Sequence, residues 1–180
     1  YFERLKRSAG LSSTSRVATF AGRAILSPSQ KVPPYWRRNF SSRQLLLSSY
    51  HISERTCDSY ITALEEYSPD FIDSYPSSLE PIARRILERG GTSLKLKAVI
   101  TSSESLHDSV RVVIESAFGC PVFDYYGSAE MVAFVSQCAG GSYHVNEDFG
   151  YLEIIGENGK RVADGEEGEI VATGFVNHTM

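Results

Sequence analysis

The sequence predicts an α/β fold: a mostly parallel sheet of βα units flanked by helices, followed by the start of an antiparallel β-rich subdomain. Apolar, strand-like runs end near residues 50, 75, 101 and 125, and amphipathic segments separate them. Crossovers of such length are typical of parallel strands. After residue 140 the helical periodicity stops and Asn-Gly and Asp-Gly turn pairs appear. We therefore expect an α/β part over residues 1–140 and the start of a β-rich part over residues 141–180.

The first predicted strand covers residues 16–26, and residues 45–50 form a short apolar run suited to a buried strand. Ser53 is expected to cap the helix that follows, and Pro69 to end it. Apolar residues recur in this helix at helical spacing: Cys57, Tyr60, Ile61, Leu64 and Tyr67.

Residues 71–75 form the next predicted strand. Ser77 and Glu80 have the spacing of a capping box, in which each side chain bonds a free N–H group at the start of a helix. The Gly-Gly pair at 90–91 is expected to end this helix, because glycine accepts the left-handed conformation. The predicted apolar stripe is Leu79, Ile82, Ala83, Ile86 and Leu87.

Residues 96–101 are rich in β-branched side chains and predict a further strand, as do residues 121–125. Ser105 with Asp108 is expected to cap the helix between them, and Gly119 to end it. The predicted inner face of this helix is Leu106, Val110, Val113, Ile114, Ala117 and Phe118.

The last part of the chain predicts an antiparallel meander. Its expected strands are residues 151–155, 160–163 and 168–175, joined by turns at Asn158-Gly159 and Asp164-Gly165.

The composition restricts the class of protein. Hydrophobic residues make up 42% of the chain, as in ordinary globular domains. The net charge of −4 disfavours a general binder of nucleic-acid backbones, and every apolar run is too short to cross a bilayer. Three cysteines without framework-like spacing favour a reduced, cytoplasmic location. Because the chain opens on Tyr1 and closes on Met180, we expect it to be a fragment of a longer protein.

The fold rule for parallel α/β sheets places ligands beyond the carboxyl ends of the strands. The segments expected there are unusually rich in aromatic residues, hydroxyls and acids. They are Tyr50-His51, residues 75–78, residues 102–104 and residues 125–130. An acid three residues after Gly127 is suited to hold a metal ion that faces phosphates.

These residues carry a resemblance to a known family. The segment FDYYGSAE at residues 123–130 resembles the aromatic-Gly-x-x-Glu nucleotide motif of adenylate-forming enzymes, and in particular the phenylacetate-CoA ligase-like and CapK-like (capsule biosynthesis) branch. Four more segments resemble that branch in the same order: YPSSLEPIARRIL (75–87), AVITSSESL (98–106), YHVNEDFGYLEII (143–155) and GEIVATGF (168–175). The resemblance covers roughly residues 16–180, and it identifies residues 1–140 as part of an N-terminal AMP-binding domain.

The resemblance implies a two-step reaction with ATP, Mg²⁺ and CoA. A carboxylic acid attacks the α-phosphorus of ATP, pyrophosphate leaves, and a thiol takes the acyl group from the acyl-AMP. Matched motif to motif, Tyr126 stacks on adenine, Asp124 accepts from the adenine amino group, and Ser103 and Glu104 line the adenine edge. Glu130 is the implied catalytic Mg²⁺ ligand. Further nucleotide contacts are implied for Tyr125, Gly127 and Ser128, and an acyl-substrate pocket for Tyr50, His51, Tyr75 and Ser77.

The sequence departs from the family pattern before the metal-binding acid. The family commonly has Ser or Thr there, with a hydroxyl for the α-phosphate, whereas this chain has Ala129. The phosphate loop and the C-terminal catalytic lysine of the family are also not in the sequence, so the fragment alone is expected to be inactive.

Structural explanations compete with the functional ones at several positions. Tyr125 and Tyr126 also suit core aromatics at a strand end, and Glu104 suits an exposed acid at a helix start. His51 also suits a buried, satisfied histidine. Ser77 is first of all a helix cap.

Cys138 and His144 have the C-x₅-H spacing of half a structural Zn²⁺ site. Some members of the resembled branch complete such a site with a downstream Cys-x-Cys pair. The alternative is a buried thiol and an unrelated surface imidazole.

The sequence therefore predicts an ATP-dependent ligase that forms acyl- or aryl-CoA from a small carboxylic acid. Two alternatives stay open: a non-catalytic or non-CoA adenylate-forming homologue in polysaccharide biosynthesis, and a nucleotide-sugar transferase with a similar sheet. Neither nucleic acid nor a membrane is an expected partner.

Overall fold

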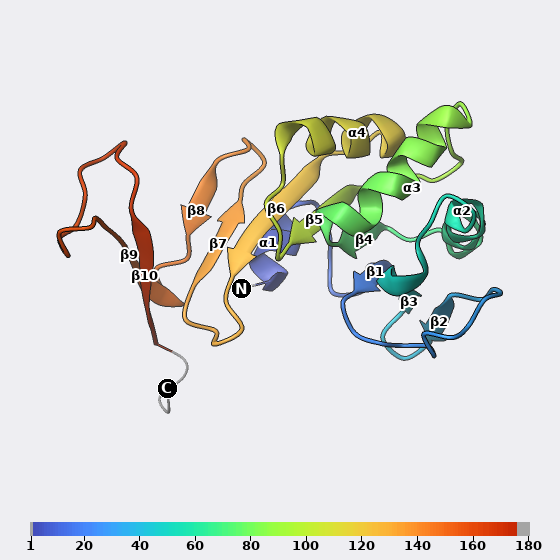
Figure 1. Ribbon diagram of the computed structural model, residues 1–180, viewed down its shortest axis with the longest axis horizontal. Coiled ribbons are helices and arrows are strands. Elements are labelled where there is room, and N and C mark those ends of the chain that lie inside the picture. Colours follow the sequence, from blue (N-terminus) through green and yellow to red (C-terminus); the bar gives the residue numbers. More distant parts are fainter. Residues whose placement is uncertain (1, 176–180) are drawn as a thin grey trace.

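The computed structural model describes residues 2–175, except for the side chain of Ala21. An eight-stranded sheet of order β2-β3-β1-β4-β5-β6-β7-β8 forms the body of the molecule, and β9 and β10 form a separate two-stranded sheet (Figure 1). The helices are α1 (Phe2–Ser8), α2 (Cys57–Tyr67), α3 (Pro76–Glu88) and α4 (Asp108–Phe118), with a 3₁₀ turn at Ser49–His51. The strands are β1 (Val17–Ala21), β2 (Trp36–Asn39), β3 (Gln44–Ser48), β4 (Phe71–Ser74), β5 (Ala98–Ser102), β6 (Val122–Gly127), β7 (Phe134–Gln137), β8 (Tyr143–Val145), β9 (Gly150–Ile155) and β10 (Glu169–Gly174).

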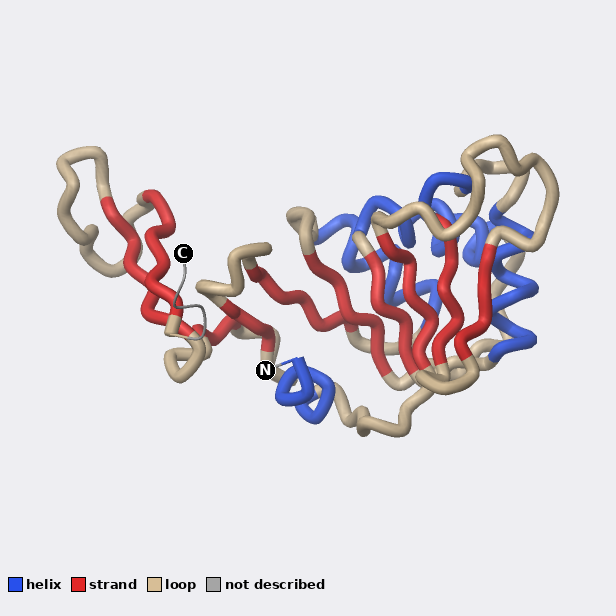
Figure 2. The backbone as a smooth tube through the Cα atoms, turned by 90° about the horizontal axis from the view of Figure 1, so that it is seen from below, coloured by secondary structure: helices blue, strands red, loops and turns tan. Residues whose placement is uncertain are grey.

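The centre of the main sheet is parallel, as the spacing of the predicted strands requires. Strands β3, β1, β4, β5 and β6 run in the same direction, while β2 at one edge and β7 and β8 at the other are antiparallel. The parallel strands line up side by side in Figure 2, with the connections gathered at their two ends. The predicted α/β class is confirmed.

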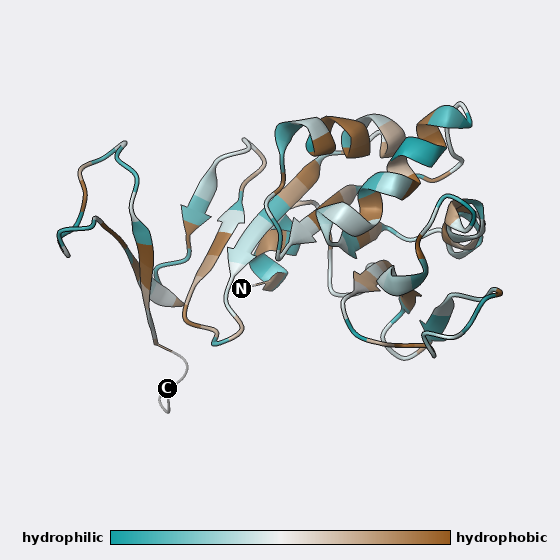
Figure 3. Ribbon diagram, in the orientation of Figure 1, coloured by the Kyte–Doolittle hydropathy of each residue, from teal (hydrophilic) through white to brown (hydrophobic). Residues whose placement is uncertain are grey.

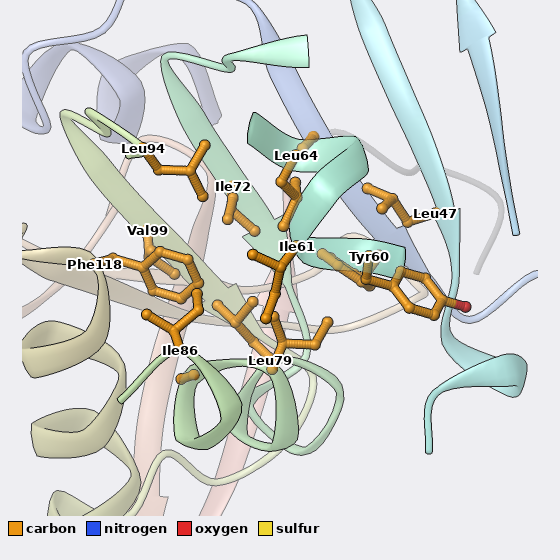
Figure 4. Packing of buried hydrophobic residues seen from close by; sticks show 14 of the residues in the cluster. Leu47, Tyr60, Ile61, Leu64, Ile72, Leu79, Ile86, Leu94, Val99 and Phe118 are labelled. Atoms are coloured by element: carbon orange, nitrogen blue, oxygen red, sulfur yellow. The ribbon is translucent and has the colours of Figure 1, made fainter. Parts of the chain in front are cut away.

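Helices α2, α3 and α4 cover one face of this sheet and enclose the main core (Figures 1 and 4). Tyr60, Ile61, Leu64, Leu79, Ile82 and Ile86 are fully buried there against Ile72 and Val99 of the strands. The buried hydroxyl of Tyr60 donates to the carbonyl of Ser48 at 2.6 Å, so this aromatic residue brings no unsatisfied polar group into the core. Figure 3 shows the hydrophobic residues concentrated on the central strands and in bands along α3 and α4.

Helix α1 contributes to a second, smaller core on the opposite face of the sheet. Leu5 of α1, together with Ala9 and Leu11, packs against Phe71, Ala98, Ile100 and Phe123. Helix α1 and strands β2, β7 and β8 are not among the predicted elements. They are short, and β2 and β8 consist mainly of exposed residues, so their hydrophobic periodicity is weak.

The predicted helix starts are wrong at three places. Helix α2 begins at Cys57 after Thr56, and Ser53 lies in the preceding turn, where its carbonyl accepts from the Cys57 N–H. Helix α3 begins at Pro76 rather than with a Ser77–Glu80 capping box, because Tyr75 is the cap residue. Helix α4 begins at Asp108 after His107, so Ser105 is not its cap.

The predicted helix ends agree better with the structure. Gly119 ends α4 in the left-handed conformation, and the Gly91 N–H bonds back to the carbonyl of Ile86. The predicted apolar stripe of α3 is buried except for Leu87, which is 43% exposed.

The antiparallel region differs from its prediction in two respects. Residues 160–163 make only a single bridge, between Arg161 and Ile155, instead of a strand. Strand β8 still belongs to the main sheet, and the separate sheet begins at Gly150. Its root packs on the β6–β7 connection, where a Cβ atom on Gly150 would lie 2.0 Å from the carbonyl oxygen of Val132. Whether 1–140 and 141–180 form separate domains stays a prediction.

Within the described residues, no helix combines the length and the apolarity needed to cross a bilayer.

The two leucines of α3 make a matched stability test. Leu79 is fully buried and Leu87 is 43% exposed. We expect Leu79→Ala to lower the free energy of unfolding by about 2–5 kcal/mol, because it leaves a cavity in the core. Leu87→Ala is expected to cost less than about 1 kcal/mol. Urea unfolding of both variants checks this, and equal losses would contradict the assigned orientation of α3.

Candidate functional site

The carboxyl ends of β5 and β6 border a cavity of about 590 Å³, here called the strand-end pocket. Its lining residues are Ser103, Glu104, Ser105, Leu106, Asp124, Tyr125, Tyr126, Gly127 and Tyr143. The structure therefore brings together six of the predicted nucleotide contacts, from two segments about twenty residues apart in the sequence. These two segments lie together because β5 and β6 pair in parallel, so that their carboxyl ends are neighbours.

Strand alternation separates the two neighbouring tyrosines. Tyr125 packs on the α1 face, with its ring centroid 5.6 Å from that of Phe2 and 5.1 Å from that of Phe134. Tyr126 is on the other face, and its side chain is 44% exposed. Tyr125 therefore fits the explanation that it is a core aromatic residue, whereas one face of the Tyr126 ring is accessible to a ligand.

Asp124 is buried and held by hydroxyl groups on both sides. The Thr101 hydroxyl donates to its Oδ1 at 2.6 Å, and the Tyr143 hydroxyl donates to its Oδ2 at 2.7 Å. Burial, followed by the hydrogen bond to Asp124, raises the pKa of Tyr143 to about 12, so this hydroxyl keeps its proton at neutral pH. The carboxylate of Asp124 is thereby fixed in position at the wall of the pocket.

Glu104 joins two of the strand-end loops. Its carboxylate accepts from the backbone N–H of Ser77 at 2.9 Å and from the Ser77 hydroxyl at 2.7 Å. Ser77 lies in the first turn of α3, where free N–H groups attract a negative charge. Glu104 therefore caps α3 from the neighbouring loop, while it also lines the strand-end pocket.

A tight turn follows Gly127. The Met131 N–H bonds the carbonyl of Ser128, and the Ser128 hydroxyl accepts from the Val132 N–H at 3.3 Å. The Ser128 hydroxyl thus acts as an acceptor within the turn and keeps its own O–H as a donor. Ala129 and Glu130 lie exposed in this turn.

The predicted acyl-pocket residues fall into three places. Tyr50 and Tyr75 meet at Gly22: the Tyr50 hydroxyl donates to the Gly22 carbonyl at 2.7 Å, and a Cβ atom on Gly22 would lie 2.6 Å from the Tyr75 hydroxyl oxygen. Ser77 is with Glu104 instead.

His51 is packed against the core rather than exposed to a cavity. Its Nδ1 lies 2.7 Å from the Ser48 hydroxyl, and its ring stacks on Tyr35 with 5.3 Å between centroids. Its Nε2 is buried and has no hydrogen-bond partner among the described residues. The role of His51 in an acyl pocket stays a prediction.

Cys138 and His144 do meet, across the hairpin of β7 and β8. The register pairs Ser136 with His144, and Cys138 follows β7 directly. The hydrogen bond from His144, followed by the backbone N–H groups of Gly140 and Ser142, lowers the pKa of the Cys138 thiol. In the part of the chain that the structure describes, no group of three or more His, Cys, Asp or Glu side chains is arranged to hold a metal ion.

The sequence reasoning did not single out Thr101, Gln137 or Tyr143 as site residues. Gln137 is buried, and its Oε1 accepts from the Asp124 N–H at 3.0 Å and from Arg111 at 2.8 Å. These partners of Asp124 come from β5, β7 and the start of β8. A polar residue inside a short strand is the only local signal they carry.

With the fold and the pocket described, the chain can be compared with known proteins. No family model matches it. The structure of the chain resembles that of 2-hydroxyisobutyryl-CoA ligase in complex with 2-HIB-AMP and CoA, with a TM-score of 0.69 and 20% identity over 96% of this chain and 39% of that one. A benzoate CoA ligase from Burkholderia xenovorans LB400 has a TM-score of 0.63 and 20% identity over 96% of this chain and 36% of that one. The chain thus has the α/β fold of adenylate-forming enzymes, as the resemblance in the sequence implies.

The similarity in sequence points to a particular relative. Protein CapK of Staphylococcus aureus is 30% identical over 180 residues, which cover 99% of this chain and 39% of CapK. The chain therefore spans about two fifths of the length of the curated relative it matches. The expected resemblance to CapK-like proteins is confirmed.

The three cysteines make an internally controlled test of the hairpin. Burial raises the pKa of Cys57 and raises that of Cys120 to about 12, whereas the pKa of Cys138 is lowered. Because the thiolate is the nucleophile, iodoacetamide at pH 7 is expected to modify Cys138 first in chelator-treated protein. His144→Asn is expected to slow that modification by about threefold or more, since the largest cause of the lowered pKa is lost. Peptide mass spectrometry measures all three sites; equal rates, or no effect of His144→Asn, would contradict the contact.

Proposed function

We propose that the protein containing this chain activates a carboxylic acid with ATP and then transfers the acyl group to a thiol, with CoA as the acceptor. One observation carries the proposal: the strand-end pocket presents an exposed aromatic ring, a fixed carboxylate and a glycine together at the carboxyl ends of parallel strands. The fold it belongs to is shared with ligases whose structures contain an acyl-AMP and CoA.

The pocket suits an adenine ring. Tyr126 offers an exposed face, and stacking of a base on such a ring stabilises binding by about 1–3 kcal/mol. Asp124 is held by Thr101 and Tyr143, so its oxygens form a preorganised acceptor for an amino group. Ser103 and Glu104 border the same cavity and are the proposed edge contacts.

The phosphates need positive charge that this pocket does not itself contain. Among the described residues that line the strand-end pocket there is no lysine or arginine. Glu130, exposed in the turn after Gly127, is the proposed ligand for Mg²⁺, which prefers carboxylate and phosphate oxygens. The ion would neutralise charge on the triphosphate.

In the proposed first step a carboxylate oxygen of the acid attacks the α-phosphorus, and the bond to the β-phosphate oxygen breaks. Pyrophosphate leaves with that electron pair. In the second step the thiol sulfur attacks the acyl carbon, and AMP leaves. The contribution of this chain is to position the adenine and the acid, since holding reactants in line supplies much of such catalysis.

The acid is proposed to lie near Tyr75, which borders both Gly22 and the carboxyl end of β4. Tyr50, which meets Tyr75 at Gly22, stays a proposed neighbour of the acyl group. The zinc site at Cys138 and His144 also stays a proposal, supported by their contact. Zinc added to the alkylation assay would protect Cys138 if it is a ligand.

A second candidate is an adenylating enzyme with an acceptor other than CoA. It is kept because the relative with 30% identity is named only protein CapK, whereas the two CoA ligases are each 20% identical to this chain. Both candidates share the first step and differ only in what takes the acyl group.

The full-length gene product is expected to release pyrophosphate from ATP only when a suitable carboxylic acid is present. A panel of short aliphatic, aromatic and fatty acids, each tested with and without CoA, measures the two steps separately. Acid-dependent pyrophosphate release that consumes no CoA would favour the second candidate. Formation of ADP instead of AMP would contradict adenylation.

Glu130→Gln is expected to lower turnover by about 100-fold at saturating acid, because the neutral amide keeps the shape of the side chain but loses the charge that holds Mg²⁺. Its thermal midpoint is expected to change little, since the residue is exposed. Glu167→Gln, at an exposed position before β10, is the control. Wild-type turnover of Glu130→Gln at saturating Mg²⁺ would reduce Glu130 to a surface acid.

A further inference from the structure

A second cavity, of about 200 Å³, opens at the carboxyl ends of β1, β4 and β5 on the α1 face of the sheet. It is called the Asp73 pocket here, and its lining residues are Thr19, Phe20, Asp73, Ser74, Tyr75, Ser102, Ser103 and Tyr125. Ser103 and Tyr125 also line the strand-end pocket. The two cavities therefore adjoin, one on each side of the carboxyl ends of β5 and β6.

Asp73 comes to this pocket by strand alternation. It lies two residues after Phe71, which is buried in the α1-face core, and in register between Thr19 of β1 and Ile100 of β5. Neighbouring positions on this face are occupied by Ala98, Ile100 and Phe123. An apolar surface thus ends in a single carboxylate at the edge of a cavity.

The structure gives this carboxylate no partner of its own. Among the described residues, no hydrogen bond or ion pair reaches Asp73, and the nearest acting charge is Lys6, whose ammonium group pairs with Glu3. Burial raises the pKa of Asp73 to about 6, against the opposing effect of Lys6. Asp73 is only partly buried, so water can still reach its carboxylate, and a ligand that filled the pocket would have to supply a donor in place of that water.

The remaining walls are suited to a short polar acyl group. The Tyr125 and Ser102 hydroxyls hydrogen-bond to each other, and Tyr75 contributes an aromatic face. The Thr19 hydroxyl accepts from the Gln44 side chain at 2.9 Å, and its own O–H is left to donate into the pocket. Asp73 is the only carboxylate among the residues that line this pocket.

We propose that Asp73 is the specificity-determining residue of the acyl site, and that it selects short carboxylic acids that carry a hydrogen-bond donor, an ammonium or a hydroxyl group, at the end away from the reacting carboxylate. This inference rests on the proposed function, because it places the acid of that reaction in the Asp73 pocket. An acid ending in a methyl group would bury the carboxylate without a donor. Sites built for a polar group reject such analogues strongly.

The test uses acids of equal size that differ only at the far end: pentanoate, 4-hydroxybutyrate and 4-aminobutyrate, together with the series one carbon longer. The full-length gene product is expected to prefer a donor-bearing acid over the methyl acid by about tenfold or more in kcat/KM for pyrophosphate release. Comparison of the hydroxy acid with the amino acid shows which of the two donors the pocket binds.

Two variants separate recognition from folding. Asp73→Asn is expected to lose at least about tenfold of any preference for the ammonium acid, and Asp73→Val to favour the methyl acid. Both are expected to be at least as stable as the wild type, because they remove a partly buried charge that no described residue pairs with. Asp164→Asn, in an exposed turn, is the control with the same change of charge far from the pocket. A marked loss of stability in Asp73→Asn would show that the carboxylate is structural and would overturn the proposal.

Two further outcomes separate the failure of this proposal from the failure of the proposed function. If acids are adenylated but the preference for donors is missing, or survives in Asp73→Val, which has no acceptor, the proposal fails while the proposed function stands. If no acid releases pyrophosphate, the proposed function fails, and calorimetric titration of the same acids then tests the site by itself. Binding of donor-bearing acids that Asp73→Asn weakens by about tenfold would support the site; equal binding to both proteins would overturn it.

Discussion

The parallel hydrogen-bonded register of β1, β4, β5 and β6 is the constraint on which the rest of the molecule depends. Because these strands run in the same direction, every loop that follows one of them lies at the carboxyl ends of the strands. Helices α3 and α4 return the chain to the amino ends of the strands. The apolar faces of these helices bury the hydrophobic residues that hold the strands together. The candidate site is therefore a consequence of how the core is built.

The loops at that edge are held by hydrogen bonds between segments far apart in the sequence. Glu104, after β5, caps α3 through Ser77, so the position of one loop determines that of the next. Asp124 ties β6 to β5 through Thr101 and to β8 through Tyr143. These hydrogen bonds fix the wall of the strand-end pocket before a ligand binds, which lowers the entropy lost on binding.

The two faces of the sheet divide the proposed chemistry. Side chains that alternate along β6 send Asp124 and Tyr126 to the strand-end pocket and Tyr125 toward α1. On β4 the same alternation turns Asp73 toward the α1 face, beside Tyr125. Nucleotide and acid are thus proposed to approach from opposite sides of the strand ends and to meet near Ser103. The left-handed backbone of Ser103, with φ of 67°, is a local strain at that junction.

The sequence by itself determined the succession of strands and helices along the central part of the chain, the buried stripe of α3 apart from Leu87, and the strand-end segments that line the pocket. These features are local, because hydrophobic periodicity, turn residues and helix-ending glycines act over a few neighbouring residues. The helix starts at Ser53, Ser77 and Ser105 were wrong because these helices begin after Thr56, Tyr75 and His107 without a side-chain cap bond, so a serine near the start does not mark it. Only the tertiary structure decided that Ser77 binds Glu104, that Tyr143 holds Asp124 and that Asp73 is left without a donor. Those pairings depend on which strands are neighbours and on the register between them, and no short stretch of sequence contains that information.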